Sequence, residues 1–293
     1  MGLAEWFSGF CSNLTVKDGG TISTRYRNIT KRLNTDFWGV NSEIYHSLYV
    51  GSYGRNTATN GLSDVDMIFE LPYSEYTKYN NYLGNGQSAL LQSVKRSIEK
   101  TYGTTSIRGD GQVILVPFLD GITFEVLPAF INGDDSYTFP DANNGGRWRI
   151  TNPKPEISAI KSRNTLTNKN LVQLCRMTRA WKRKWNVPIS GLLIDTLAYQ
   201  FIENWGHRDK SYLYYDFMSR DFFKWMAEQD TSREYWRAPG SGQFVYGKGL
   251  FQFKARQCYN IALEAIDHEL ATPKREWSAK QKWREIYGTT FPD

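Results

Sequence analysis

The sequence has few residues of the kinds that form disulfide frameworks or metal clusters. It holds three cysteines and three histidines in 293 residues, all far apart, with no Cys-x-x-Cys pair. An odd and scattered cysteine set argues against a disulfide framework, so we expect a protein of the reducing cytoplasm. The same scarcity argues against a zinc site.

Long apolar runs and leader-like segments are missing as well. No run of about 18 apolar residues occurs, so we expect no membrane-spanning helix and no membrane partner. The first residues, MGLAEWFSGF, lack the basic start and apolar core of a secretory signal. Trp6 stands where a myristoylation motif requires Ser or Thr, so we expect no lipid anchor either.

The charge excess is small, and the densest basic cluster is RMTRAWKRKW at 176–185. Lys and Arg number 36 against 30 Asp and Glu, which gives a net charge of +6, and no block of five like charges occurs. This balance favours anionic partners such as nucleotides without identifying one. Hydrophobic residues make up 40% of the chain, which is enough for a sizeable core, and the length suits two domains or one bilobed unit.

The order of the periodic segments predicts an α+β fold with two lobes. Helical spacing covers residues 21–38 and 86–103, and strand patterns cover 46–50, 65–71, 112–119 and 122–127, with a hairpin turn at Asp120-Gly121. Residues 131–156 are rich in Gly, Asn, Asp and Pro and indicate a loop or linker. The remainder reads as helices that end in a short tail. We therefore expect a mixed-sheet lobe at 1–150 and a helical lobe at 151–293.

Two carboxylates stand at the start of an apolar strand in the stretch GSYGRNTATNGLSDVDMIFEL. Asp64 and Asp66 are two residues apart, so in a strand their side chains point to the same face. Glu125, in ITFEVLP, lies on another expected strand. If those strands are neighbours, three carboxylates converge and repel one another unless they are protonated or metal-bound. Hard oxygen ligands suit Mg²⁺ or Mn²⁺, and two such ions would activate a hydroxyl and stabilise departing pyrophosphate.

A glycine-serine turn precedes these carboxylates. Backbone N–H groups at such a turn can bind an anion, and glycine permits close approach of the backbone. We expect Gly51 and Ser52 to bind phosphate, with Arg55 within reach of it. Taken singly, each feature has an ordinary structural interpretation, such as a helix cap or an edge-strand charge. Their occurrence together, in this order, favours a metal-dependent nucleotide site.

At this point the chain resembles a known family. The Gly-Ser turn followed by Asp64-x-Asp66 and a later third acid is similar to the signature of the polymerase-β-like nucleotidyltransferases. More narrowly, ITFEVLPAF, RWRITNPKPEI and RAWKRKWNVPISGLLIDTLAYQF resemble segments of the bacterial CD-NTases. Those enzymes are relatives of cyclic GMP-AMP synthase and oligoadenylate synthase that act in CBASS anti-phage signalling. The resemblance extends over nearly the whole chain, including the expected helix at 21–38.

The resemblance implies an activity and a set of site residues. It implies a bilobed enzyme that binds NTPs, ATP and GTP foremost, with Mg²⁺ or Mn²⁺ at Asp64, Asp66 and Glu125. Many relatives have aspartate where this chain has Glu125. The helical lobe of the family contributes a basic residue and a serine to the triphosphate. The matching positions here are Arg179 or Lys182, and Ser190, although Ser190 also suits a helix N-cap.

The resemblance also implies partners. A cyclic di- or trinucleotide would be sensed by a downstream effector, and we expect the synthase itself to be a monomer. Direct activation by double-stranded DNA through a zinc thumb is not expected, because the chain has no Cys/His cluster.

Three functions remain open from the sequence. The first is a synthase that joins NTPs into a cyclic nucleotide and releases pyrophosphate. The second is a linear oligonucleotide synthase, or a transferase that adds one nucleotide to RNA, protein or a small molecule. The third is a nucleotide-binding module without catalysis, which the intact three-acid set disfavours.

Overall fold

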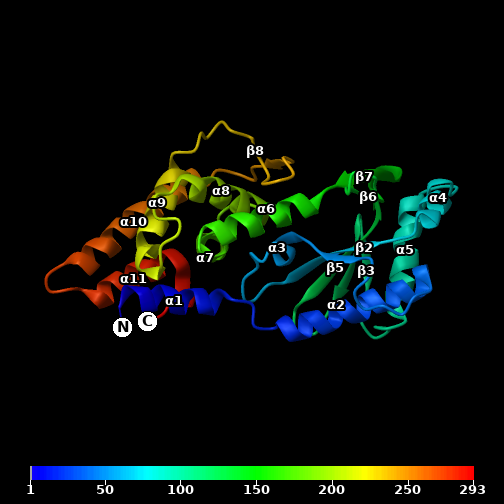
Figure 1. Cartoon of the computed structure of the whole chain (residues 1–293), viewed down its shortest axis with the longest axis horizontal. Helices are drawn as coiled ribbons and strands as arrows, with labels where there is room; N and C mark the ends of the chain where they lie inside the picture. Colours follow the sequence, from blue (N-terminus) through cyan, green and yellow to red (C-terminus); the bar gives the residue numbers. More distant parts are fainter. Residues whose placement is uncertain (1) are drawn as a thin grey trace. The chain divides into compact units, whose positions relative to one another are not determined.

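The computed structural model describes residues 2–293, and their contacts divide the chain into two compact units (Figure 1). The sheet unit comprises Val16–Arg55 and Gly61–Lys154. The helical unit comprises the chain up to Thr15, Asn56–Asn60 and Pro155–Asp293. The chain therefore passes from one unit to the other four times, after Thr15, Arg55, Asn60 and Lys154, whereas the sequence suggested a single boundary near residue 150. The difference arises because the N-terminal helix packs into the core of the C-terminal helices, and the short segment 56–60 is hydrogen-bonded to them.

The sheet unit is built on one seven-stranded mixed sheet. The main strand order is β1-β2-β5-β4-β3, and β6 and β7 extend it from β5. Strands β2 and β5 run parallel, and the other pairs are antiparallel. The expected Asp120-Gly121 turn joins β4 to β5, with Gly121 at a φ of +87°. The strand bounds are Ser47–Tyr49, Asp64–Glu70, Arg108–Asp110, Val113–Pro117, Thr123–Ile131, Tyr137–Asp141 and Arg147–Thr151 for β1 to β7.

Two helices cover one face of this sheet (Figure 1). Helix α2 (Gly19–Leu33) buries Ile22, Ile29 and Leu33 at the spacing that predicted it, and a π-helical segment continues it over Asn34–Trp38. Helix α5 (Gly86–Glu99) adds a second apolar row against the same core. A short helix, α4 (Tyr73–Asn80), packs on α5. These helices therefore leave the opposite face of the sheet uncovered.

The segment expected to be a loop between the lobes is a β-hairpin followed by a helix. Strands β6 and β7 pair in antiparallel fashion, and β6 also pairs with the end of β5. Tyr137 and Phe139 alternate inward from β6 and are buried. The Gly and Asn residues that suggested a linker lie mainly in the turns at each end of these strands, where Asp135 and Asn144 have positive φ. Composition alone did not separate turns from the strands between them.

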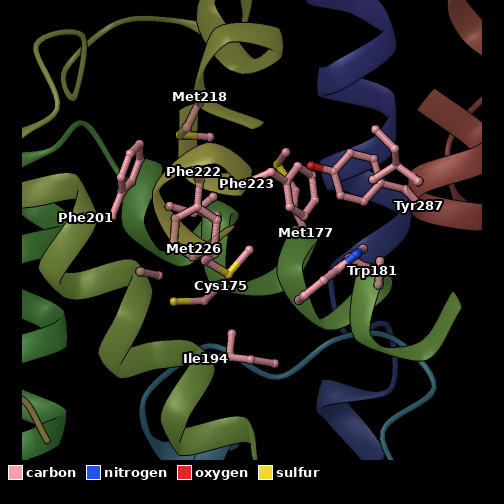
Figure 2. Packing of buried hydrophobic residues seen from close by; sticks show 14 of the residues in the cluster. Cys175, Met177, Trp181, Ile194, Phe201, Met218, Phe222, Phe223, Met226 and Tyr287 are labelled. Carbon is pink, nitrogen blue, oxygen red and sulfur yellow. The ribbon is translucent and has the colours of Figure 1, made fainter. Parts of the chain in front are cut away.

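The helical unit surrounds a single large apolar core. Side chains from α7, α8, α9 and α11 meet there, among them Trp181, Phe222 and Tyr287 (Figure 2). The short C-terminal tail is anchored, because Phe291 is fully buried. No described helix is long and apolar enough to cross a membrane. The helices are α1 (Leu3–Leu14), α6 (Pro153–Leu166), α7 (Asn170–Trp185), α8 (Gly191–Asn204), α9 (Tyr215–Ala227), α10 (Gln252–Leu270) and α11 (Glu276–Tyr287), with a hairpin of β8 (Tyr235–Arg237) and β9 (Phe244–Tyr246).

Candidate active site

The glycine-serine turn lies directly against the second aspartate. After β1 the chain turns into the single-turn helix α3 (Gly51–Gly54). The N–H of Val50 donates to the main-chain carbonyl of Asp66 at 3.0 Å. Gly51 has a φ of +60°, and a Cβ placed on it would lie 1.8 Å from Oδ2 of Asp66. Only glycine fits there without moving the carboxylate, so the turn and the acid form one local structure.

The three acidic residues predicted from the sequence lie on one face of neighbouring strands. Asp64 and Asp66 are alternate residues of β2, and Asp66 is the direct register partner of Glu125 on the parallel strand β5. The residues between them, Val65 and Phe124, are fully buried in the core beneath α2 and α5. The expectation that the two strands are neighbours is thus confirmed. The carboxylates occupy the face of the sheet that those helices do not cover.

The carboxylates act on one another electrostatically. The pKa of Glu125 is raised to about 7, first by burial and then by the charges of Asp66, Asp64 and Asp110. Burial also raises the pKa of Asp66, and Arg55 opposes this effect. Arg55 itself is buried, so its charge balances Asp66 from within the protein. Asp64 is exposed, and its Oδ2 accepts a hydrogen bond of 2.7 Å from the Ser63 hydroxyl.

Asp110 is a fourth carboxylate that sequence reasoning missed. It ends β3, two strands away from Glu125 in the order β5-β4-β3, and its charge contributes to the raised pKa of Glu125. Its sequence context, RGDGQ, looks like an ordinary turn. Only the strand order brings it near the other acids.

The oxygen donors of these residues suit a hard cation whose coordination is completed by substrate oxygens. Among residues 2–293, no group of three or more His, Cys, Asp or Glu side chains could hold a metal ion by itself. Mg²⁺ in nucleotide sites is commonly held by one or two carboxylates together with substrate phosphates. The register pair Asp66 and Glu125, with Asp64 on the same face, has the oxygen chemistry for that role.

The basic helix of the helical unit contributes to a buried ion pair. Arg179 is 8% exposed, and its guanidinium forms a bidentate pair with Asp195 at 2.6 and 2.9 Å. It also donates to the carbonyls of Cys175 and Gly191. These contacts use four of the five N–H donors of Arg179 and support a structural role. Phosphate binding by Arg179 stays a prediction.

The neighbouring arginines of α7 hold the segment that follows the glycine-serine turn. Arg176 donates to the carbonyl and side chain of Asn56, and Arg183 donates to the Thr59 hydroxyl at 2.7 Å. The Thr57 hydroxyl donates to Asp195 at 2.9 Å. Asp195 gave no signal in the sequence because it is a single carboxylate in a mainly apolar helix, GLLIDTLAYQF. Segment 56–60 is thus fixed to α7 and α8.

Lys182 and Ser190 have an ammonium group and a hydroxyl group, respectively, that can bind an anion. Lys182 is half-buried, and its pKa is lowered by burial and by the charges of Lys248 and Arg179. Ser190 is the N-cap of α8, where its Oγ accepts a hydrogen bond from the N–H of Leu193 at 3.1 Å. The hydroxyl proton of Ser190 remains available for donation. A cation whose pKa is lowered by like charges favours an anionic ligand.

The aromatic residues of β6 and β7 divide into buried and partly exposed rings. Tyr137 is fully buried, and its hydroxyl donates to Glu70 at 2.6 Å. Phe139 is buried as well. Trp148 packs on Tyr76 and donates to Asn80. Core packing therefore accounts for Tyr137 and Phe139.

Comparison with known proteins gives a family and a fold. Residues 1–164 match the family model described as Second Messenger Oligonucleotide or Dinucleotide Synthetase domain. The sequence matches none of the curated proteins with which it was compared.

Solved structures share the fold at low identity. CdnC of E. coli MS115-1, solved in complex with HORMA-deltaN, is 15% identical with a TM-score of 0.67, and the match covers 99% of this chain and 98% of that one. The Bradyrhizobium diazoefficiens CD-NTase CdnG, solved with GTP, is 12% identical with a TM-score of 0.66, covering 99% and 95%. The Vibrio cholerae cyclic AMP-GMP synthase DncV is 13% identical with a TM-score of 0.63, covering 84% and 69%.

Proposed function

The chain belongs to the family of second messenger oligonucleotide or dinucleotide synthetases, and from this premise we propose that it joins NTPs into a cyclic di- or trinucleotide with release of pyrophosphate. It is accordingly a nucleotidyltransferase with the α+β fold of the CD-NTases. The observation that carries the proposal is the parallel register of Asp66 with Glu125, with Asp64 on the same face. We place the reaction at these three carboxylates, in anti-phage (CBASS) signalling.

We assign metal binding to Asp64, Asp66 and Glu125. A bound Mg²⁺ or Mn²⁺, in one or two copies, would supply charge to the transferring phosphate and lower the pKa of the attacking hydroxyl. Gly51 supports this assignment, since its lack of a Cβ leaves room for the Asp66 carboxylate where it lies. Arg55 supports it as well, because its buried charge favours the ionised form of Asp66.

We assign proton transfer to Glu125. Burial and the neighbouring carboxylates raise the pKa of Glu125 to about 7 without metal, and a bound cation would lower it, so that Glu125 would be ionised and able to accept a proton. The carboxylate would accept the proton of the attacking ribose hydroxyl. Many relatives have aspartate at this position. The longer side chain of Glu125 reaches further from β5, while the strand register fixes its backbone beside Asp66.

We assign phosphate binding to the Gly51-Ser52 turn in the sheet unit and to Lys182 and Ser190 in the helical unit. The opening turn of a helix directs backbone N–H groups outward, which suits a phosphate. The pKa of Lys182, lowered partly by Lys248, supports an anion near that side chain. Substrates would be ATP or GTP foremost. CdnC has been solved with ATP and CdnG with GTP.

The expected effector and monomeric state stay part of the proposal. The E. coli CdnC structure contains a HORMA-deltaN partner. We therefore propose that this chain, too, is tested for binding to a protein partner.

Pyrophosphate release from NTPs alone separates the three candidate functions. A synthase releases pyrophosphate with Mg²⁺ and no added acceptor, a transferase needs its acceptor, and a binding module is silent in both assays. Binding of Mn²⁺ in the presence of nucleotide, followed by electron paramagnetic resonance, gives a readout independent of turnover. The proposal predicts that Glu125→Gln and Asp66→Asn weaken Mn²⁺ binding and lower the rate of pyrophosphate release by roughly 10²-fold or more. Unchanged Mn²⁺ binding in both variants would overturn the metal assignment.

A further inference from the structure

The β8–β9 hairpin of the helical unit has an exposed outer face made of aromatic and basic side chains. In register, Trp236 faces Val245, and both are buried at 2% and 5% exposure. Strand alternation then places their neighbours on the outer face. That face consists of Tyr235, Arg237, Phe244 and Tyr246, all of them exposed. Three clustered aromatic rings in solvent are costly and indicate a binding surface.

The outer-face rings lie against one another and leave their surfaces accessible. The Tyr235 and Phe244 ring centroids are 4.6 Å apart, and those of Tyr235 and Tyr246 are 6.1 Å apart. The Arg237 guanidinium lies 4.7 Å from the Phe244 centroid and donates to the carbonyl of Gly242. Phe244 and Tyr246 remain 50% and 61% exposed. The rings and the guanidinium together form a small π-rich platform.

The chain around this platform is strongly basic. Residues 231–256 contain five cations and one acid, Glu234, which gives +4 for the segment; the cations are Arg233, Arg237, Lys248, Lys254 and Arg256. Lys248 follows β9 in the chain and is exposed. Within the described residues, neither Arg237 nor Lys248 is ion-paired with a carboxylate. Aromatic faces bordered by unpaired cations are the surface chemistry that single-stranded nucleic acids recognise.

We propose that the outer face of the β8–β9 hairpin binds single-stranded nucleic acid, with bases stacked on Tyr235, Phe244 and Tyr246 and phosphates near Arg237 and Lys248. The platform has the size that two or three stacked bases need. A stable protein partner would need about 800 Å² on each side, far more than four side chains supply. The site uses none of the proposed catalytic residues.

The test is fluorescence anisotropy of labelled oligo-U and oligo-dT of about 12 nucleotides with the full chain. The assay contains no divalent metal and an excess of ATP and GTP, so that the proposed catalytic site does not compete. We expect the double variant Tyr235→Ala/Tyr246→Ala to bind at least about tenfold more weakly, because each stacked base contributes substantially. Arg237→Gln should reduce the slope of log affinity against log salt by about 0.7. Trp277→Ala on α11, where the ring is 75% exposed, is the matched control and should change neither quantity.

Two results would overturn the proposal. One is equal binding by the wild type and the double variant, which would place the strand elsewhere. The other is no binding by the wild type. If light scattering then shows that the double variant abolishes self-association, the platform is a protein interface. Thermal unfolding of every variant confirms that the comparison is made between folded proteins.

Discussion

Gly51 and Asp66 are so close that a methyl group on the first would overlap the carboxylate of the second. The built Cβ lies 1.8 Å from Oδ2 and 2.5 Å from Cγ of Asp66. Glycine is therefore required at position 51 because any Cβ would overlap the Asp66 carboxylate. The same lack of a Cβ also leaves room for a phosphate to approach the backbone. This relationship ties the two halves of the motif, Gly-Ser and Asp-x-Asp, into one site.

Replacing Gly51 by alanine should abolish activity while costing only about 1–2 kcal/mol of the free energy of unfolding. The positive φ accounts for the stability loss. The activity loss follows because Asp66, whose side chain can rotate, must leave its position. Gly39→Ala is the matched control: its φ is +67°, and nothing lies within 4 Å of its built Cβ. Both variants should unfold alike in urea, and only Gly51→Ala should be inactive; an active Gly51→Ala would contradict the account.

Glu125 should tolerate aspartate far better than glutamine. Glu125→Gln keeps the length and removes the charge, so we expect a loss of roughly 10²–10³-fold in the rate of product formation, since metal and base contributions amount to several kcal/mol. Glu125→Asp keeps the charge and restores the residue that many relatives have. The measurement is the initial rate at saturating Mg²⁺. A wild-type rate for Glu125→Gln would remove Glu125 from the mechanism.

The buried pair of Arg179 and Asp195 should govern stability, and Lys182 should govern substrate binding. Arg179→Met leaves Asp195 buried without a counter-charge, which typically costs about 3–5 kcal/mol. Lys182→Met should leave the unfolding free energy nearly unchanged and raise the KM for NTP. Adding Asp195→Leu to Arg179→Met should recover much of the lost stability. A stable Arg179→Met variant with weakened NTP binding would reverse these assignments.

Asp216 should make the helical unit less stable as the pH rises. Burial raises its pKa to about 6, its side chain is 5% exposed, and its Oδ1 has no hydrogen-bond partner among the described residues. The folded protein therefore holds this proton more tightly than the unfolded chain does. The contribution of this proton to the free energy of unfolding is fully present below about pH 4 and is lost as the pH rises through about 6.

The variant Asp216→Asn lacks this loss. Its free energy of unfolding, relative to wild type, should increase by about 2–3 kcal/mol between pH 4 and pH 7, since each pKa unit corresponds to about 1.4 kcal/mol. Urea unfolding at a series of pH values measures the difference. Asp267→Asn, at an exposed position on α10, serves as the control and should show a flat difference. A flat difference for Asp216→Asn as well would contradict the raised pKa.

Local patterns in the sequence predicted the strands that carry Asp64, Asp66 and Glu125, because the evidence for them is local. Alternation in VDMIFEL places Asp64 and Asp66 on one face, and the Asp120-Gly121 turn fixes β4 beside β5. The Gly51 turn was likewise visible, although its contact with Asp66 was not, since that contact depends on how β1 pairs with β2.

Features that depend on distant contacts could not be read in this way. Arg179 stands in a basic run typical of a phosphate-binding surface, and only its proximity to Asp195, on the next helix, shows that it is buried. Asp110 joins the carboxylates through strand order alone. The segment 131–156 has the composition of a linker, yet the burial of Tyr137 makes it part of the sheet.

The most direct test of the central claim is product analysis from radiolabelled ATP, GTP, CTP and UTP, supplied singly and in combination with Mg²⁺. Products are treated with phosphatase and resolved, with the double variant Asp64→Asn/Asp66→Asn in parallel. The account predicts a phosphatase-resistant cyclic product from the wild type that is absent from the variant. A product that persists in the variant, or no product from the wild type under any nucleotide combination, would contradict it.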